Sequence, residues 1–168
     1  MSVRRIVVTD SNVLINIIHA NRLDFLGKLP EYEFVVLEEV VEEISVQEQK
    51  TALEQAFERQ QLKREILSGI PALTLYAELR QSMGKGEAAS LAMAVHSGSF
   101  IACDEKKVFL REARKRLGAN CILTTPGIIV LAIRAGLLTV DQADTIKAHL
   151  ETKRFKMTFS SFKDVIGV

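Results

Sequence analysis

Residues 6–15 read IVVTDSNVLI, an apolar run that ends at an aspartate and passes directly into a second apolar pattern. Because residues 6–8 contain no polar side chain, they suit a strand that is covered on both faces of a parallel sheet. Beyond Asp10 the apolar residues recur at helical spacing, at Val13, Leu14, Ile17 and Ile18. A strand that is followed at once by a helix is the repeating unit of α/β proteins.

The same unit recurs along the chain. Further apolar runs stand at residues 34–37, 100–103 and 121–123, and a helical stripe of Val40, Val41 and Ile44 follows the first of them. Gly118 offers a helix C-cap before the last run. We therefore predict an α/β fold with a parallel central sheet of four or five strands.

The remaining segments predict helices. Residues 47–68 are rich in Gln, Glu, Lys, Arg and Ala, which indicates an exposed helix or helical arm. Residues 73–76 fit either a short extended piece or the start of a helix. Helices are also expected at 126–135 and, with Thr139 as N-cap, at 139–150. We expect one domain over residues 1–151 and a C-terminal extension, residues 152–168, that packs on the domain or on a partner.

The composition fits one compact domain and points to no particular partner. Of the 168 residues, 48% are hydrophobic and the formal net charge is +1, so a nucleic-acid role cannot be argued from charge. Cys103 and Cys121 lie in apolar runs without neighbours at metal-ligand spacing, and we interpret both as buried thiols. The N-terminus lacks the pattern of a secretory signal and no run is long enough for a membrane span, so we expect a cytoplasmic protein.

Four acidic residues stand where strands end or where the next helices begin. Asp10 and Asp104 directly follow the runs at 6–9 and 100–103, and in open parallel sheets ligands bind beyond the carboxyl ends of the strands. Glu87 opens an alanine-rich helix after a Gly-Lys-Gly turn, and Glu43 lies in the second helix beside its apolar stripe. We therefore expect the four side chains to meet at one edge of the sheet.

Each acid also has a simpler interpretation. Taken singly, Asp10 fits a helix N-cap, Glu87 a favourable charge at a helix N-terminus, and Glu43 an exposed acid. Their combined placement favours the functional interpretation. The other acids of the second helix are expected to face solvent: Glu38, Glu39 and Glu42.

Carboxylates that are brought close together repel one another and are costly to desolvate unless protons or cations neutralise them. A site with only oxygen ligands favours hard ions, of which Mg²⁺ and Mn²⁺ fit best. Such ions activate water and stabilise the charge that builds on a phosphate. The acids therefore predict the chemistry of a nuclease.

A set of ordered motifs resembles those of the PIN-domain family. They comprise an apolar strand with an Asp, a helix whose Glu precedes an aliphatic residue, a G-x-G-E-A segment, a strand-acid-helix ending and the segment after the last strand. In chain order they are residues 7–15, 40–44, 84–92, 101–105 with 113–118, and 125–131. The resemblance runs from about residue 5 to about residue 140.

The resemblance implies a three-layer α/β/α sandwich. It implies that Asp10, Glu43, Glu87 and Asp104 bind Mg²⁺ or Mn²⁺ and catalyse the cleavage of single-stranded RNA. It also implies a homodimer and service as the toxin of a type II toxin–antitoxin system, with an antitoxin protein as partner. Side chains that orient the carboxylates are expected at Ser11, Asn12 and Thr124.

One departure from the family pattern concerns the metal count. Many members carry a further acid just beyond the last strand, where Thr124 and Thr125 stand in this chain. A site of three or four carboxylates would remain, which leaves the occupancy by two metals and the activity itself open.

Candidates for contacts with substrate phosphates lie near the acids in the sequence: Lys85, Lys106, Lys107 and Arg111. Such residues also occur as an ordinary solvated face. The aromatic residues near the C-terminus are expected to pack an ending helix or a partner surface rather than to stack on bases: Phe155, Phe159 and Phe162.

Two other functions compete with the ribonuclease. A phosphatase could use Asp10 as a nucleophile, but such enzymes usually need another acid two residues later, where Asn12 stands. The stronger alternative is a PIN-like module of weak or lost activity that acts in a regulatory or protein–protein complex.

Overall fold

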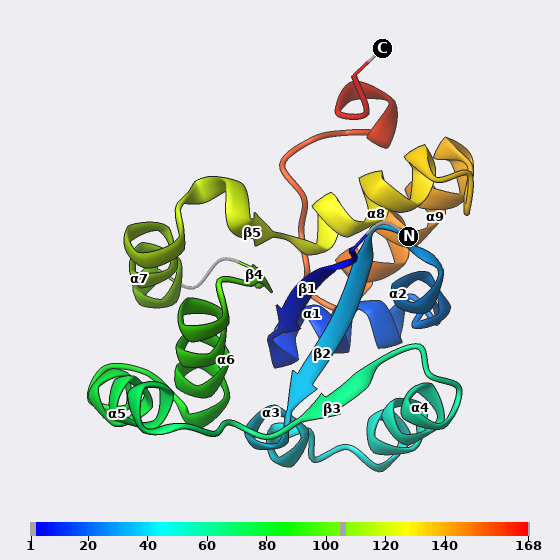
Figure 1. Cartoon of the computed structure of the whole chain (residues 1–168). Coiled ribbons are helices and arrows are strands. Elements are labelled where there is room, and N and C mark those ends of the chain that lie inside the picture. Colours follow the sequence, from blue (N-terminus) through cyan, green and yellow to red (C-terminus); the bar gives the residue numbers. More distant parts are fainter. Residues whose placement is uncertain (1–2, 105–106, 168) are drawn as a thin grey trace.

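The computed structural model describes residues 3–104 and 107–167, and its centre is a five-stranded sheet (Figure 1). All recorded strand pairs are parallel, and the order across the sheet is β3-β2-β1-β4-β5. The predicted α/β fold with a parallel sheet of four or five strands is therefore confirmed. The strands are β1 (Arg5–Thr9), β2 (Tyr32–Leu37), β3 (Lys63–Glu65), β4 (Phe100–Ala102) and β5 (Ile122–Leu123).

The edge strand β3 was not predicted. Residues 47–68 were expected to be one helix or arm, but the helix ends at Glu58 and Lys63–Glu65 pairs with the end of β2. The sequence of β3 is Lys-Arg-Glu, so it has no apolar residue that periodicity could detect. Pairing with β2 alone makes it a strand.

Helices fill the connections between the strands. Residues 73–76, for which the sequence left two possibilities, are helical. Thr139 is an N-cap, as expected, and it forms a complete capping box with Gln142. No helix in the described ranges is both long enough and apolar enough to cross a bilayer. The α-helices are α1 (Ser11–His19), α2 (Asp24–Lys28), α3 (Glu38–Glu43), α4 (Gln47–Glu58), α5 (Ile70–Leu79), α6 (Lys85–Ser97), α7 (Lys107–Leu117), α8 (Thr125–Arg134) and α9 (Val140–Thr152), and the 3-10 turns are η1 (Ala119–Cys121) and η2 (Phe162–Asp164).

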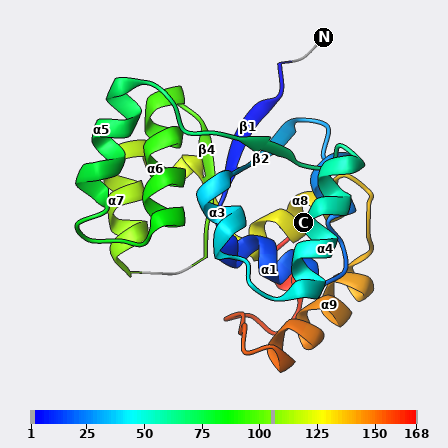
Figure 2. The same ribbon diagram turned by 90° about the horizontal axis from the view of Figure 1, so that it is seen from below.

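Helices cover both faces of the sheet, which gives the three layers (Figures 1 and 2). Val7 packs with residues of α1, α2, α4 and α8 on one face. Its neighbour Val8 packs with residues of α5, α6 and α7 on the other. Successive strand residues point to opposite faces, so both sides of β1 are buried, as its unbroken apolar run predicts.

The C-terminal segment packs on the domain through a third apolar cluster. Phe162 of η2 is fully buried against Phe25 of α2 and Ile129 of α8. The carboxylate of Asp144 on α9 accepts hydrogen bonds from the Ser161 hydroxyl (2.6 Å) and the Phe162 backbone N–H (2.8 Å). These contacts fasten the segment after α9 to the rest of the fold.

Candidate active site

Asp10 and Asp104 follow the neighbouring strands β1 and β4 at the carboxyl edge of the sheet. β1 and β4 are neighbours, with Thr9 opposite Ala102, and the Asp10 backbone N–H donates to the Ala102 carbonyl at 2.9 Å. Only 1% of Asp10 and 8% of Asp104 are exposed. Two acids from distant parts of the chain are thus buried at adjacent strand ends.

Asp10 occupies the N-cap position of α1, but its side chain makes no capping hydrogen bond to that helix. Thr124 and Thr139, in contrast, each accept a backbone N–H in the first turn of their helices. The simple interpretation of Asp10 as a capping residue therefore does not account for its buried carboxylate.

Hydrogen bonds from Thr125 and Asn16 orient the Asp104 carboxylate. Oδ1 accepts the backbone N–H of Thr125 at 2.8 Å, and Oδ2 accepts the Thr125 hydroxyl at 2.5 Å and the Asn16 amide at 3.0 Å. Asn16 Nδ2 also lies 3.4 Å from the Thr125 hydroxyl oxygen. Asn16, Asp104 and Thr125 therefore form one buried polar network between α1, the end of β4 and the start of α8.

Glu43 and Glu87 meet at the glycine turn that begins α6. The Gly86 backbone N–H donates to Glu43 Oε1 at 2.7 Å, which ties the end of α3 to the first turn of α6. A Cβ on Gly84 would lie 3.7 Å from Glu87 Oε1 and 3.9 Å from Glu43 Oε1. A Cβ on Gly86 would come within 2.6 Å of the Glu43 carboxylate, so only glycine lets that carboxylate approach the backbone.

Three of the four acids surround Cys103. Burial raises the pKa of this thiol to about 12, and the negative charges of Asp10, Asp104 and Glu87 contribute to the rise. Asp10, Asp104 and Glu87 therefore all lie close enough to Cys103 to act on its thiol, and Glu43 approaches Glu87 at Gly84. Cys103 is buried as expected, whereas Cys121 is only half-buried.

The acids do not gather around one point. Over residues 3–104 and 107–167, no group of three or more Asp, Glu, His or Cys side chains is close enough to hold one metal ion. Mg²⁺ is usually held in proteins by one or two carboxylates and several waters. The arrangement in pairs, with oxygen donors throughout, suits that mode of binding.

The hydrogen bonds seen at Asp104 come from residues other than the expected Ser11, Asn12 and Thr124. Within the described part of the chain, Asp104 accepts from Asn16 and Thr125, whereas the Thr124 hydroxyl caps α8 and Asn12 lines a cavity beside Asp104. Ser11 is buried at the start of α1. The sequence held a signal for Asn16, because it stands one helical turn after Asn12 on the same face of α1.

The candidate phosphate-binding cations lie on the surface. Lys85 and Lys107 are exposed at the starts of α6 and α7, and Arg111 is exposed one turn further along α7. Lys106 lies outside the described residues. Glu38 and Glu39, expected to face solvent, are instead half-buried on α3, where Glu38 pairs with Arg64. Glu42 is exposed as expected, and Glu43, expected to point inward, is exposed as well.

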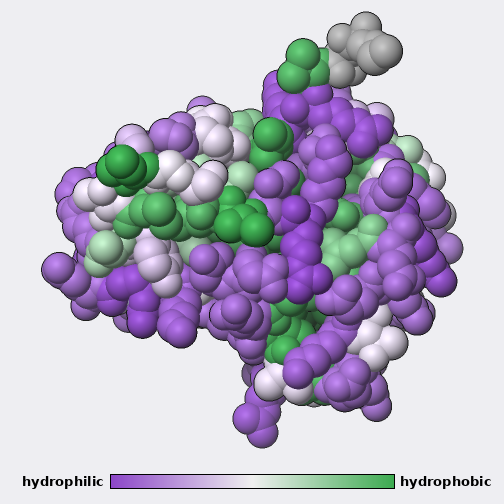
Figure 3. Space-filling model, turned by 60° about the horizontal axis from the view of Figure 1, so that its bottom comes forward, coloured by the Kyte–Doolittle hydropathy of each residue, from purple (hydrophilic) through white to green (hydrophobic). Residues whose placement is uncertain are grey.

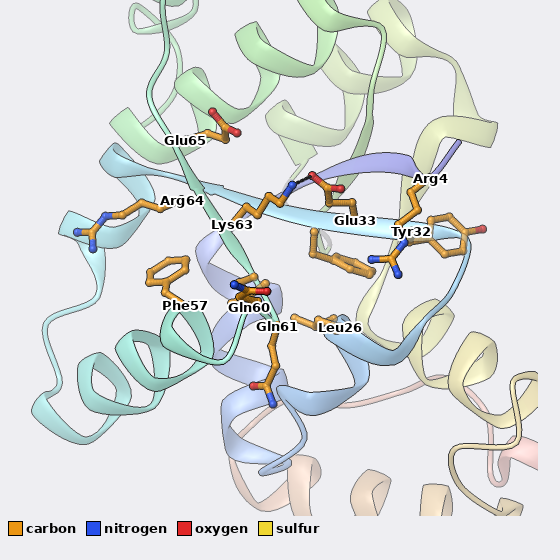
Figure 4. Close-up of a pocket in the computed structure, with 13 residues that line it drawn as sticks. Arg4, Leu26, Tyr32, Glu33, Phe57, Gln60, Gln61, Lys63, Arg64 and Glu65 are labelled. Atoms are coloured by element: carbon orange, nitrogen blue, oxygen red, sulfur yellow. Dashed lines mark ion pairs between the residues drawn. The ribbon is translucent and has the colours of Figure 1, made fainter. Parts of the chain in front are cut away.

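Two cavities differ in their relation to the acids. One, of about 670 Å³, is lined by Asp104 and Asn16 together with residues of the segment after α9. The other, of about 540 Å³, lies beside β2 and β3, and none of the four acids lines it (Figure 4). Two of its three lining cations, Lys63 and Arg64, are held in ion pairs with Glu33 and Glu38.

Comparison with known proteins identifies the class. The model of the family DUF3368, described as a PIN domain, matches residues 6–166. The chain therefore belongs to the PIN-domain family, whose members share a nuclease-type fold and are generally nucleases. The match includes the segment after α9 as well as the four acids. No match is found among curated proteins.

Proposed function

We propose that this protein is a metal-dependent endoribonuclease that hydrolyses phosphodiester bonds of single-stranded RNA. The observation that carries the proposal is the burial of Asp10 and Asp104 at adjacent strand ends, with Glu87 and Glu43 close by. Buried acids at the carboxyl ends of neighbouring strands in an α/β sheet lie where such folds place their functional sites.

The proposed cofactor is Mg²⁺ or Mn²⁺. Asp10 and Asp104 would hold it directly, and Glu87 and Glu43 would act on it through its bound waters. When bound, the ion would stabilise negative charge on the phosphate and activate the attacking water. The hydrogen bonds from Thr125 and Asn16 keep the Asp104 carboxylate in one orientation.

The test of this proposal is cleavage of a pool of single-stranded RNA by the purified chain, freed from any bound protein. We expect cleavage with Mn²⁺ or Mg²⁺, none with EDTA, and little with duplex RNA. Products with new ends inside the strand would show endonucleolytic cutting. If the folded protein leaves all RNA intact with both ions, the ribonuclease proposal is wrong.

Thr125→Val tests the network around Asp104. The variant keeps the backbone N–H that donates to Oδ1 but loses the hydroxyl that donates to Oδ2. Loss of a side chain that orients a metal ligand typically costs roughly 10- to 100-fold in metal affinity or activity. We expect a loss of that size in Mn²⁺ affinity, measured by calorimetric titration, and in cleavage rate. Thr125→Ser, which retains the hydroxyl, is the control, and equal behaviour of the two variants would contradict the positioning role.

Gly86→Ala tests the contribution of Glu43. The added Cβ would overlap the Glu43 carboxylate and expel it from the Gly86 N–H. Because alanine favours a helix over glycine by about 1 kcal/mol, we expect stability to change little while cleavage falls to the level of Glu43→Gln. Gly84→Ala is the matched control, since its Cβ would meet nothing closer than 3.7 Å. Full activity of Gly86→Ala would remove Glu43 from the site.

A second candidate function is a PIN-like module that has lost catalysis and acts in a complex. It is favoured by Thr124 and Thr125, which stand where many family members have their last acid. Thr125 donates two hydrogen bonds to the Asp104 carboxylate, one from its backbone N–H and one from its hydroxyl. Titration with Mn²⁺ separates the two functions, because an inactive module is expected to bind the ion weakly. Such a module is also expected to keep its free energy of unfolding when Asp10 is changed to asparagine.

The proposal extends to protein partners: a homodimer, and a toxin–antitoxin pair in which this chain is the toxin. Support comes from apolar side chains exposed on and before α5, seen as a green patch at the left of Figure 3: Ile66, Ile70 and Leu73. Light scattering measures the homodimer, and a monomeric mass at micromolar concentration would contradict it. Relief of growth inhibition by a co-expressed neighbouring open reading frame tests the antitoxin.

A further inference from the structure

The cavity beside Asp104 has a wall made by the segment that follows α9. Residues 153–159 line one side, while Asn12, Ile15 and Asn16 of α1 line another. Thr124 and Pro126 at the start of α8 complete it. Its volume of about 670 Å³ lies within the ~300–1,000 Å³ typical of ligand sites. Since Asp104 lines the cavity, a ligand there would lie against the candidate active site.

The charges of this wall are positive. Lys153, Arg154 and Lys156 are exposed and line the cavity, and Asp104 is its one acidic lining residue among those described. None of the three cations forms an ion pair within the described ranges, and the nearby Glu151 pairs with Lys147 at 2.5 Å. This differs from the cavity of Figure 4, where Lys63 pairs with Glu33. In a chain of net charge +1, the cations are thus gathered where a phosphate chain would approach the acids.

Arg154 stands at a backbone position that favours glycine. α9 ends with the Arg154 N–H donating to the Glu151 carbonyl and the Phe155 N–H donating to the Leu150 carbonyl, and Arg154 has φ 67°. α8 ends in the same way, but there the equivalent residue is Gly136. A residue with a side chain is strained in this conformation. Arg154 thus lines the cavity from a backbone conformation that would suit glycine better.

The aromatic residues of the segment have two roles in this arrangement. Phe162 is fully buried, as expected for packing, and Phe159 contacts it edge to face with ring centroids 5.0 Å apart. Phe155 and Phe159 are only half-buried, and both also line the cavity. Aromatic rings next to free cations are the combination that binds single-stranded nucleic acids, through base stacking and phosphate contacts.

We propose that residues 153–159 form the RNA-binding wall of this enzyme, with the three cations contacting phosphates on one side of the bond that is cut and Phe155 stacking on a base. This inference rests on the proposed ribonuclease function and names the residues that hold its substrate. It adds to the cations predicted from the sequence near α6 and α7 a second set, contributed by the C-terminal segment.

The test measures binding separately from catalysis. The affinity of a fluorescent single-stranded oligoribonucleotide is determined by anisotropy in EDTA, over a range of salt concentrations, for the full chain. Arg154→Gly is the informative variant, because glycine suits the backbone and the melting temperature should stay equal or rise. Each phosphate contact that is lost should reduce the slope of log K against log[salt] by about 0.7, so a variant that also carries Lys153→Ala and Lys156→Ala should lose about 2.

Gln60→Gly is the matched control. Gln60 has φ 58° at the end of α4, where its N–H and that of Gln61 donate to Phe57 and Ala56 as in α9. The substitution relieves the same backbone strain, and Gln60 does not line the cavity beside Asp104. Phe155→Leu keeps an apolar side chain but removes the ring, and we expect a roughly tenfold weaker affinity.

The outcomes separate this inference from the proposed function. Weakened binding and a reduced salt slope in Arg154→Gly but not in Gln60→Gly support the RNA-binding wall, even if the wild type cuts nothing with Mn²⁺. Unchanged RNA binding in the triple variant overturns it, even if the wild type is an active ribonuclease. Absence of RNA binding together with tight binding of a polyglutamate peptide would also overturn it, in favour of an acidic protein partner.

Discussion

Asp10→Asn should abolish Mn²⁺-dependent cleavage of single-stranded RNA while the protein stays folded. The substitution keeps the shape of a side chain that is 1% exposed and removes its negative charge. Loss of a residue that merely orients a metal ligand lowers activity roughly 10- to 100-fold, so loss of the metal ligand itself should lower the cleavage rate more than about 100-fold. Cleavage rates under single-turnover conditions, with circular dichroism to verify the fold, measure the effect.

Asp104→Asn is the companion variant, with an added cost in stability. Its amide NH₂ would face a donor on either side, because Oδ1 accepts from the Thr125 N–H and Oδ2 accepts from Asn16. We expect a loss of about 1–3 kcal/mol in the free energy of unfolding, together with loss of cleavage. Asp141→Asn, in the exposed first turn of α9, is the control and should alter neither. If Asp10→Asn cleaved RNA as fast as the wild type, the proposed site would be contradicted.

Phe162→Ala should destabilise the whole domain by about 3–5 kcal/mol. Phe162 is fully buried among residues of α2, α8 and α9, so its removal leaves a cavity in the third apolar cluster. For a domain of this size, such a loss corresponds to a fall in melting temperature on the order of 10 °C. Urea unfolding followed by circular dichroism gives the free energy directly.

The control for this variant is the exposed neighbour Lys163→Ala, which should be neutral. Phe162→Leu should lie between the two because it fills part of the cavity. A stability of Phe162→Ala equal to that of the wild type would mean that the C-terminal segment does not contribute to the core. Phe162→Ala is also expected to weaken RNA binding, because the wall of residues 153–159 is held in place by η2.

The strands that could be predicted are those with apolar sequences, including the edge strand β5 in the run 121–123. β1, β2 and β4 consist largely of apolar residues, and the runs at 6–8, 34–37 and 100–103 mark them in the sequence. β3 consists of charged residues at the edge of the sheet, where one neighbour and solvent surround it. Its strand conformation comes from pairing with β2, which no local pattern encodes.

The same distinction holds for the candidate site. The positions of Asp10 and Asp104 follow from strand ends, so a local pattern is sufficient to place them on one edge. The hydrogen bond from the Gly86 N–H to Glu43 depends on how α3 and α6 pack. The hydrogen bond from Thr125 to Asp104 depends on the distance between the start of α8 and the end of β4. Contacts set by packing between distant segments could not be predicted from residue types.

The two outer strands limit how copies of this molecule can associate. β3 presents Lys, Arg and Glu along its free edge, and β5 at the other edge has two residues. Short or charged edges discourage the addition of a strand from another molecule. Self-assembly would therefore have to join helical surfaces, and the sheet would remain the same width in a dimer as in a single chain.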